Sequence, residues 1–355
     1  MKKALKIVLI ILAVLILLIA AYVIYVFASY HRMGDSTLIP INNSVDKTTP
    51  GESYSILSYN IGFGAYESDY GFFMDGGTQS WAWSKERLDT NLKNITNVLK
   101  EANTDFYLIQ EVDTDSTRSY YTDERDYIIP GLPGYSYSFA RNYDSPFLFY
   151  PIFQPHGASR SGILTLANKK ITSADRVELP IEEGITKLLD LDRCFSKNRI
   201  ATNNGGQLII YNFHLSAYTS DGSIATEQLI MLLKDMESEY QQGNYCIAGG
   251  DFNKDILGNS SDYFGKSDIE YTWAQPLPEG LFDNYNVYLV APFDENNPVP
   301  TCRNADSAYH KGQYVLTIDG FMVTNNVRVS DIKVIDTQFA YSDHNPVRMN
   351  FTLVK

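Results

Sequence analysis

An unbroken run of apolar residues, from Ile7 to Ala28, is the strongest pattern in the chain. As an α-helix these 22 residues span about 33 Å, more than the roughly 30 Å hydrocarbon core of a bilayer. A cleaved signal peptide is the alternative, but its apolar region normally has about 7 to 15 residues and is followed by small residues. Here the run is longer, and bulky Tyr22 and Tyr25 lie near its end. The pattern predicts an uncleaved transmembrane anchor over residues 7–28.

The charges beside this run predict its orientation. Three lysines precede the run, whereas only His31 and Arg32 follow it closely. An excess of positive charge marks the cytoplasmic side of a membrane segment. We therefore expect a short cytoplasmic N-terminus over residues 1–6, with the rest of the chain extracytoplasmic. Residues 29–51 contain Pro, Gly, Asn and Ser without apolar periodicity, which predicts a linker to one globular domain over residues 52–355.

The globular part alternates short strand patterns with two helical ones. Residues 84–102 carry Leu88, Leu92, Ile95 and Leu99 on one helical face, and residues 223–240 have a similar apolar face. β-branched and aromatic runs predict seven strands, at residues 54–59, 106–110, 162–166, 207–213, 245–248, 315–323 and 347–353. No repeat of 20 to 50 residues is present. This order favours an α/β or α+β fold, and the pattern alone does not choose between them.

Composition narrows the class of protein. With 44% hydrophobic and 20% charged residues, the chain has material for a packed core, which excludes disorder and collagen-like structure. The net charge of −13 disfavours an extended grip on nucleic acid, although a local basic groove remains compatible with it. Cys194, Cys246 and Cys302 are far apart and form no C-x-x-C pair, so we expect buried free thiols rather than a disulfide framework or a zinc ribbon.

Polar side chains stand at the ends of six of the apolar runs. A buried sheet tolerates such residues only where they find partners, so six endings of one kind predict a common site. The residues are Asn60, Gln110 and Glu111, Asn212 and His214, Asp251 and Asn253, Asp319, and Asp343 and His344.

These residue types suit metal-assisted hydrolysis. Glu111 offers the hard oxygen ligand that Mg²⁺ or Mn²⁺ prefers. In an extended chain Asp251 and Asn253 would point to the same face, where they could hold a phosphate ester and its attacking water. His344 has the chemistry of a general base, and Asp319 is the expected partner that orients its ring.

Each of these signals is unspecific when taken singly. Asn60 and Asn212 are also typical turn residues, and Glu111 or Asp251 could cap a helix. A lone histidine such as His214 is more often structural than catalytic. The sequence around His344 could be a surface turn before a proline. The prediction of a functional site therefore depends on finding polar residues at the ends of six apolar runs in one chain.

Together these residues resemble the endonuclease/exonuclease/phosphatase superfamily, the deoxyribonuclease-like metal-dependent phosphoesterases. The most specific pieces are Gly250-Asp-Phe-Asn253 and Ser342-Asp-His-Asn-Pro346, and the resemblance extends over about residues 54–353. It implies a two-sheet sandwich with helices on both outer faces, a four-layer fold that the predicted transmembrane helix would precede.

The resemblance also implies roles for the site residues. Glu111 is similar to the principal Mg²⁺ ligand of the family, with Mn²⁺ and Ca²⁺ as alternative ions, and Asn60 and Asp343 would lie close to the metal. Asp251 and Asn253 resemble the pair that orients water and phosphate. His344 with Asp319 resembles the histidine–carboxylate dyad that acts as general base, and His214 resembles the second histidine, which contacts phosphate or protonates the leaving oxygen.

Three further expectations are less specific. Arg160 and Arg199 could clamp a phosphate through their guanidinium groups, or serve as surface and packing arginines. Asp144 is a candidate carboxylate partner for His214. The aromatic, proline-rich segment 143–156 could line a substrate cleft, touch lipid or cover the core as a loop.

The expected function is that of a membrane-anchored, externally facing Mg²⁺-dependent phosphoesterase. Its expected substrate is a phosphodiester, either nucleic acid or a phospholipid headgroup, and the net acidity disfavours nucleic acid. The alternatives are a catalytically inactive binding module on the same scaffold and a phosphomonoesterase acting on inositol phosphates. The lipid bilayer is the expected partner of residues 7–28, and no protein partner is inferable.

Overall fold

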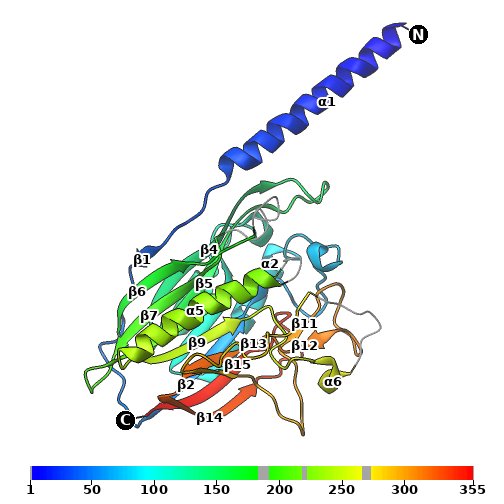
Figure 1. Cartoon of the computed structure of the whole chain (residues 1–355). Coiled ribbons are helices and arrows are strands. Elements are labelled where there is room, and N and C mark those ends of the chain that lie inside the picture. Colours follow the sequence, from blue (N-terminus) through cyan, green and yellow to red (C-terminus); the bar gives the residue numbers. More distant parts are fainter. Residues whose placement is uncertain (1, 183–191, 218–221, 266–272, 355) are drawn as a thin grey trace.

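The computed structural model describes residues 2–182, 192–217, 222–265 and 273–354. One long helix, α1 (Lys2–Ser29), projects from a body built around two β-sheets (Figure 1). By length and composition α1 can cross a membrane, and most of its side chains are exposed. It includes the whole predicted apolar run, and it begins earlier, at Lys2.

The body contains a six-stranded sheet and a seven-stranded sheet, each with a parallel pair near its centre. The six-stranded sheet has the order β14 (Val327–Val334), β15 (Val347–Leu353), β2 (Ser53–Asn60), β3 (Phe106–Asp113), β5 (Gly157–Ala167) and β4 (Ser136–Leu148). The seven-stranded sheet has the order β1 (Ser36–Leu38), β6 (Ile171–Glu178), β7 (Cys194–Ala201), β8 (Gln207–His214), β9 (Tyr245–Asp251), β13 (Asp319–Thr324) and β10 (Val287–Val290). A separate two-stranded ladder joins β11 (Cys302–Arg303) and β12 (Val315–Leu316). The parallel pairs are β2 with β3 and β8 with β9.

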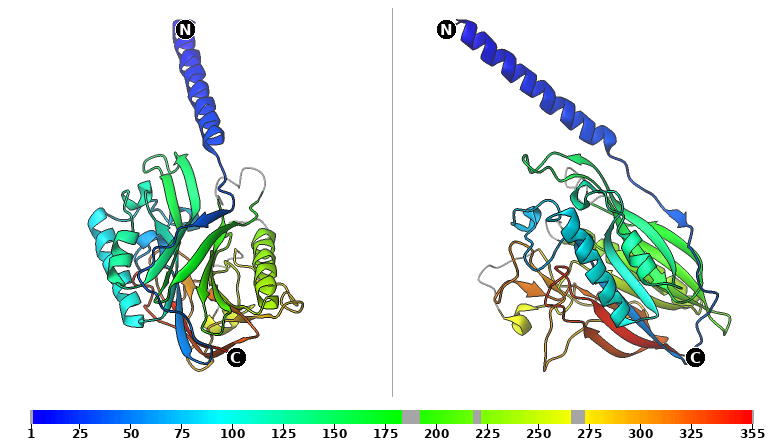
Figure 2. Two further views of the ribbon diagram at one scale, coloured as in Figure 1. Left: turned by 90° about the vertical axis from the view of Figure 1, so that its left-hand side faces the viewer. Right: turned by 180° about the vertical axis from the view of Figure 1, so that it is seen from behind.

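Helices cover both outer faces of the sandwich (Figures 1 and 2). Helix α2 (Lys85–Ala102) packs on the six-stranded sheet, where Leu92 and Leu99 join Tyr107 in one buried cluster. Helix α5 (Ser223–Gln241) packs likewise on the seven-stranded sheet. Within the described residues the shorter helices are α3 (Arg125–Gly131) and α6 (Ser261–Phe264), with three 3-10 turns, Gly62–Gly64, Phe73–Asp75 and Thr117–Ser119. The four-layer fold expected from the sequence is confirmed.

Strand alternation builds the core between the sheets. In β2, Ile56 faces the seven-stranded sheet, whereas its neighbour Leu57 faces helix α2. Ile56 joins Leu108, Ile210 and Ile247 in the inter-sheet cluster. Because successive side chains of a strand point to opposite faces, each central strand feeds two apolar layers.

The predicted strand at 315–323 is two strands in the structure. The ladder breaks at Thr317 and Ile318, whose carbonyl groups accept hydrogen bonds from the backbone N–H groups of Ile256 and Phe252. The backbone polar groups are thus satisfied by the loop after β9 instead of by a continuous strand. The break lets β12 pair with β11 while β13 joins the seven-stranded sheet.

The aromatic segment 143–156 is partly a strand. Its first residues lie in β4, which pairs with β5. Of the expected alternatives, a loop covering the core therefore does not describe Tyr143 through Leu148, which are in a strand. All three cysteines are buried free thiols, as predicted.

Candidate active site

A cavity of about 300 Å³ lies where the two sheets meet at one end of the sandwich. The expected site residues that line it are Glu111, His214, Asp251, Asn253, Asp343 and His344. Asn60 and Asp319 contact this group through hydrogen bonds. The structure thus brings together all eight expected metal and catalytic residues.

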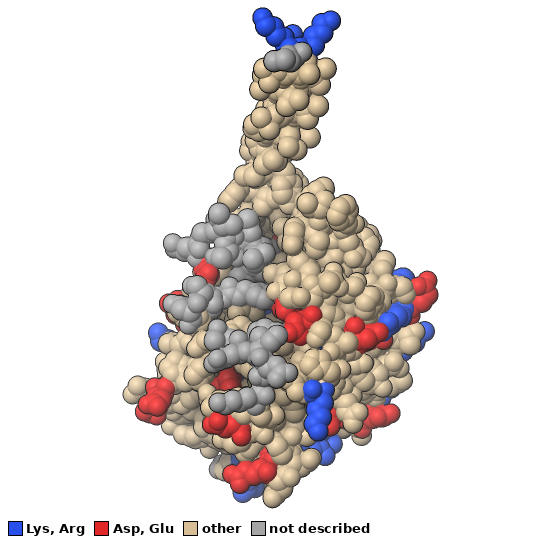
Figure 3. All heavy atoms as spheres, turned by 90° about the vertical axis from the view of Figure 1, so that its right-hand side faces the viewer, with Lys and Arg blue, Asp and Glu red and all other residues tan. Residues whose placement is uncertain are grey.

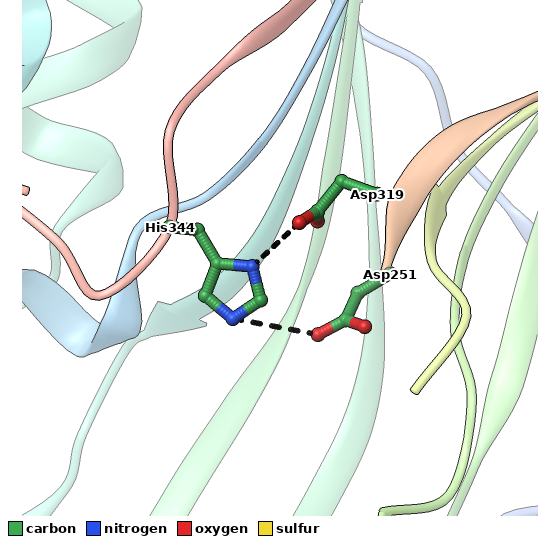
Figure 4. A group of neighbouring side chains, drawn as sticks. All are labelled: Asp251, Asp319 and His344. Carbon is green, nitrogen blue, oxygen red and sulfur yellow. Dashed lines mark hydrogen bonds and ion pairs between the residues drawn. The ribbon is translucent and has the colours of Figure 1, made fainter. Parts of the chain in front are cut away.

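His344 and Asp319 form a buried dyad at this cavity. Nδ1 of His344 lies 2.8 Å from Oδ2 of Asp319, and Figure 4 shows the carboxylates of Asp319 and Asp251 pointing toward the imidazole ring. Burial alone would lower the pKa of His344, but the charge and hydrogen bond of Asp319 outweigh it and raise this pKa well above its usual value. The dyad is therefore a tightly coupled acid–base pair.

Pairing of β9 with β13 sets Asp251 directly opposite Asp319. Oδ2 of Asp251 is 3.7 Å from Nε2 of His344 and 3.5 Å from Nε2 of His214. Burial raises the pKa of Asp251 to about 7, and the charge of Asp319 adds to this effect while His344 opposes it. One carboxylate thus stands between two imidazole rings.

Asn253 reaches the site by a route that differs from the prediction. Strand β9 ends at Asp251, and Asn253 has a positive φ of 48°, so extended-chain alternation does not align the two side chains. Instead the backbone N–H of Asn253 donates to Oδ1 of Asp251 over 2.8 Å, and its Nδ2 donates to the carbonyl of Leu215 over 2.7 Å. An Asx-type turn, which Asp favours, holds the pair together.

Glu111 is directed to the cavity by a β-bulge. The register of β3 against β5 shifts between Ile109 and Val112, and Glu111 itself has φ of 56°. A non-glycine residue rarely adopts this conformation, and such strain is commonly found at functional sites. Nδ2 of Asn60 bridges Oε1 of Glu111 at 3.2 Å and Oδ2 of Asp251 at 3.1 Å.

The donor set around Glu111 fits a divalent cation. The carboxyl of Asp343 is buried, and burial together with the negative charge of Glu111 raises its pKa to about 6 against the opposing charge of His344. A bound cation would relieve this repulsion between carboxylates. A Cβ at Gly62, which has a positive φ of 51°, would lie 3.0 Å from Oδ1 of Asp343, so only glycine leaves this approach open. The carboxylate oxygens of Glu111 and Asp343 are donors that Mg²⁺ prefers, whereas the amide oxygen of Asn60 accepts a hydrogen bond from the N–H of Gly62.

A second group of residues in the site has ligand atoms close enough together to hold a metal ion. Ligand atoms of Asp251, Asp319 and His344 all lie within 4.8 Å of one another. Two of these three residues already share the 2.8 Å hydrogen bond of the dyad. The expected metal ligands Glu111 and Asp343 line the same cavity.

His214 ends β8 beside Asp251. Burial lowers its pKa well below the usual value, and the positive charges of Arg193, His344 and Arg118 act in the same direction. Both effects favour the neutral form of the ring. Asp144, the expected partner of His214, instead accepts a hydrogen bond from Arg141 over 2.8 Å, so the structure corrects that expectation in favour of Asp251.

Neither expected phosphate clamp lines the cavity among the described residues. Arg160 pairs with Asp115 and Asp144, and Arg199 lies 2.5 Å from Glu239 on the outer side of the seven-stranded sheet. Both guanidinium groups are engaged in ion pairs outside the cavity, so neither residue is placed to clamp a phosphate there.

Two other arginines line the cavity and were missed from the sequence. Arg193 is 8% exposed, precedes β7, and lies beside His214. Arg303 is almost fully buried, and its guanidinium donates to backbone carbonyls such as those of Glu67 and Tyr70. A single arginine next to a strand has no distinctive pattern, so only the folded chain identifies these two.

Comparisons with known proteins agree with this architecture. The Endonuclease/Exonuclease/phosphatase family matches residues 57–344. A comparison with curated protein sequences finds no match. Among solved structures, an endonuclease/exonuclease/phosphatase from Beutenbergia cavernae is similar, with 15% identity and a TM-score of 0.56 over 85% of this chain and 72% of that one.

Two further structures share the fold. ANGEL2, a 2′,3′-cyclic phosphatase solved with adenosine-2′,3′-vanadate, has 17% identity and a TM-score of 0.56, covering 89% of this chain and 98% of its own. Truncated TDP2 from Caenorhabditis elegans has 15% identity and a TM-score of 0.51, covering 85% and 98%. At such low identity these likenesses show the fold, whereas the family match spans most of the chain. The chain belongs to the endonuclease/exonuclease/phosphatase family of metal-dependent phosphoesterases.

Proposed function

We propose that this protein is a membrane-anchored, externally facing phosphodiesterase that uses Mg²⁺ to direct water onto phosphorus. Residues 7–28 would cross the bilayer, with residues 1–6 in the cytoplasm and the rest of the chain outside, including β1 (Ser36–Leu38) of the seven-stranded sheet. The observation that carries the catalytic proposal is the convergence of the His344–Asp319 dyad, Asp251 and Glu111 on one buried cavity.

The dyad supports general base catalysis. In the neutral ring, Asp319 can accept a hydrogen bond from the Nδ1–H of His344, which leaves the lone pair of Nε2 free to take a proton from water. Nε2 is the nitrogen nearer Asp251. Asp251 and Asn253, held together by their turn, would orient the attacking water. Glu111, with Asn60 and Asp343, would hold the divalent cation, which supplies positive charge to stabilise the phosphate oxygens.

His214 suits the opposite end of the reaction. A phosphate beside it would bring negative charge and raise the pKa of a ring that burial and nearby arginines hold neutral. The ring could then contact the phosphate and protonate a leaving alkoxide. Diesters and monoesters both release such an alkoxide, so the two histidines on either side of Asp251 suit hydrolysis of either kind of ester.

Other substrates and a non-catalytic role stand as alternatives. The structure of ANGEL2 in complex with adenosine-2′,3′-vanadate shows that this fold accommodates a nucleoside-derived ligand in that protein, which keeps nucleic acid among the candidate substrates. A phosphomonoesterase acting on inositol phosphates would use the same cavity. An inactive binding module would have no need for the complete set of groups described above.

Hydrolysis of bis-p-nitrophenyl phosphate by the full chain in detergent tests the catalytic proposal. We expect Mg²⁺-dependent turnover that EDTA abolishes and that His344→Ala lowers by about 10²-fold or more. The matched control is His310→Ala, because His310 is an exposed histidine outside the cavity. Equal rates for both variants would eliminate His344 as the base.

A substrate panel and a topology assay complete the test. Plasmid DNA, RNA, sphingomyelin, phosphatidylinositol and inositol phosphates should be compared under one Mg²⁺ concentration. Protease added to intact cells should remove the large domain. Protection of that domain would contradict the proposed orientation.

A further inference from the structure

The tip of the β4–β5 hairpin, residues 147–153, exposes an unusual group of large apolar side chains. Phe153 is fully exposed and Tyr150 is 68% exposed, and the other members of the group are Phe147, Phe149 and Ile152. Residues 145–159 contain no Asp, Glu, Lys or Arg. Contiguous apolar surface on a protein typically marks an interaction site.

The hairpin tip touches the apolar helix α1. The backbone N–H of Phe149 donates to Oη of Tyr22 over 2.9 Å, and the N–H of Phe147 donates to Oη of Tyr25 over 3.2 Å. The rings of Tyr22 and Phe149 lie 6.2 Å apart. Both views in Figure 2 place the hairpin beside the end of α1 that joins the body.

These contacts set the depth of the tip along α1. Tyr22 precedes Ala28, the end of the apolar run, by six residues, which is about 9 Å along a helix axis. If residues 7–28 cross a bilayer, Tyr22 and Tyr25 lie within about 9 Å of the outer end of the membrane-spanning segment, close to the interface where aromatic side chains are favoured. Phe147 and Phe149 then lie at the same level.

The rest of the hairpin is held to the body. Oγ of Ser80 donates to the carbonyl of Gln154 over 2.6 Å, and Nε1 of Trp81 donates to the carbonyl of Pro155 over 2.7 Å. Burial, together with the charge of Arg118, lowers the pKa of His156 to about 3, so this ring adds no charge. In Figure 3 the tan surface of the body directly below α1 shows no Lys, Arg, Asp or Glu side chain, whereas charged side chains appear lower on the body and at the free end of α1.

A second cavity of about 90 Å³ connects the hairpin with the catalytic groups. It is lined by Glu111 and His214 on one side and by Tyr143 and His156, at the two arms of the hairpin, on the other. The ring of Tyr150 in the tip also packs 5.8 Å from that of Phe73. The base of the hairpin and the candidate active site therefore border the same cavity.

We propose that the β4–β5 hairpin tip inserts into the outer interface of the bilayer that α1 spans. The aromatic rings of the tip enter the region between headgroups and acyl chains. Apolar side chains with few charges around them favour this region of a bilayer. The hairpin tip is thus a second membrane attachment, in addition to α1, and it fixes the domain against the membrane. This position holds the catalytic cavity at headgroup level, where a lipid phosphodiester is the accessible substrate. This inference rests on the proposed anchoring by residues 7–28.

The test attaches an environment-sensitive NBD fluorophore at Phe153→Cys of the full chain in phosphatidylcholine vesicles. Tyr263→Cys is the matched control, because Tyr263 is an exposed aromatic residue on α6, distant in sequence from the hairpin. The native cysteines are buried, and burial raises the pKa of Cys194 and Cys302 to about 12, so they do not compete for the label. We expect the label at 153 to emit at shorter wavelength than the label at 263, and spin-labelled phosphatidylcholine to quench only the label at 153.

Two controls separate the possible failures. Co-flotation of the chain with vesicles reports the anchor, and turnover of bis-p-nitrophenyl phosphate by the labelled protein reports an intact fold and active site. Water-like emission at 153 in an active, floating protein would overturn the hairpin proposal and leave the proposed function standing. A shift to shorter wavelength without lipid quenching would identify a protein contact, such as a second copy, and would also overturn it. Failure to float would remove the anchoring on which both proposals depend.

Discussion

The Asp319→Asn substitution tests the role of the dyad most directly. The Asp319 side chain is 1% exposed and lies 2.8 Å from Nδ1 of His344. Asparagine has nearly the same shape, so it can keep this hydrogen bond through its amide oxygen while the negative charge is lost. The variant thus removes the stabilisation of the protonated imidazole with little change in packing.

The magnitude follows from general base catalysis. A positioned base contributes about 10²- to 10⁴-fold, and losing the carboxylate of a histidine–carboxylate pair costs about 10⁴-fold in serine proteases. We expect kcat for bis-p-nitrophenyl phosphate to fall about 10³-fold, which corresponds to about 4 kcal/mol of transition-state stabilisation. KM should change little, because Asp319 is not among the residues that line the cavity.

Stability should change modestly. Oδ1 of Asp319 is buried without a hydrogen-bond partner among the described residues. The amide nitrogen of the asparagine would take this position, and a buried unsatisfied donor costs about 1–3 kcal/mol. Circular dichroism melting should therefore show a folded variant.

Steady-state kinetics of the full chain in detergent measures the effect, with Asp331→Asn as the control because Asp331 is an exposed residue on β14. A folded Asp319→Asn variant that keeps kcat within tenfold of the natural chain would refute the dyad as the source of the base. A large rise in KM at constant kcat would show instead that Asp319 organises the binding cavity.

Three further predictions follow from other parts of the site and fold. Glu111→Gln should raise the Mg²⁺ concentration for half-maximal activity by at least about 100-fold in a metal titration, and an unchanged requirement would remove Glu111 from the metal site. Arg193→Ala should raise KM for the diester by about tenfold, since a charge-assisted hydrogen bond contributes about 1.5–3 kcal/mol, and an unchanged KM would exclude phosphate contact. Burial opposes the ionisation of Glu239, but hydrogen bonds from Arg199 and Lys197 outweigh burial and lower the pKa of Glu239 to about 2. The contribution of ionised Glu239 to the free energy of unfolding is therefore complete above about pH 4.5 and is lost as the pH falls toward 2. Glu239→Gln should therefore lower the free energy of unfolding by about 3 kcal/mol at pH 7, with a smaller difference near pH 3, and equal denaturation curves at pH 7 would contradict this.

The strands and helices that the sequence predicted share one property. Each buries a continuous or periodic apolar face, as residues 84–102 do through Leu92 and Leu99 in contact with β3. Strands β4, β6 and β14 escaped prediction because their residues are mostly polar or only half-buried, as in Ile171–Glu178. Their strand conformation depends on ladder hydrogen bonds to a neighbouring strand, and no local pattern encodes such a neighbour.

The types of residue at the site were also readable from the sequence. Asp251 and Asn253, or Asp343 and His344, end apolar runs, and burial of such residues has a cost unless partners are present. Their conformations were not readable. The bulge and positive φ of Glu111, and the turn that binds Asn253 to Asp251, replace the simple alternation that the sequence favoured.

Only the tertiary structure determines which charged groups become neighbours. Asp319 faces Asp251 because β13 pairs with β9, and His214 approaches Asp251 instead of Asp144 because β8 lies beside β9. Arg193 lines the cavity whereas Arg199, on the same sheet, pairs with Glu239. Apolar periodicity is a local property and survives in the sequence, but the distance between two charges depends on strand pairing between distant segments and appears only when the sheets are assembled.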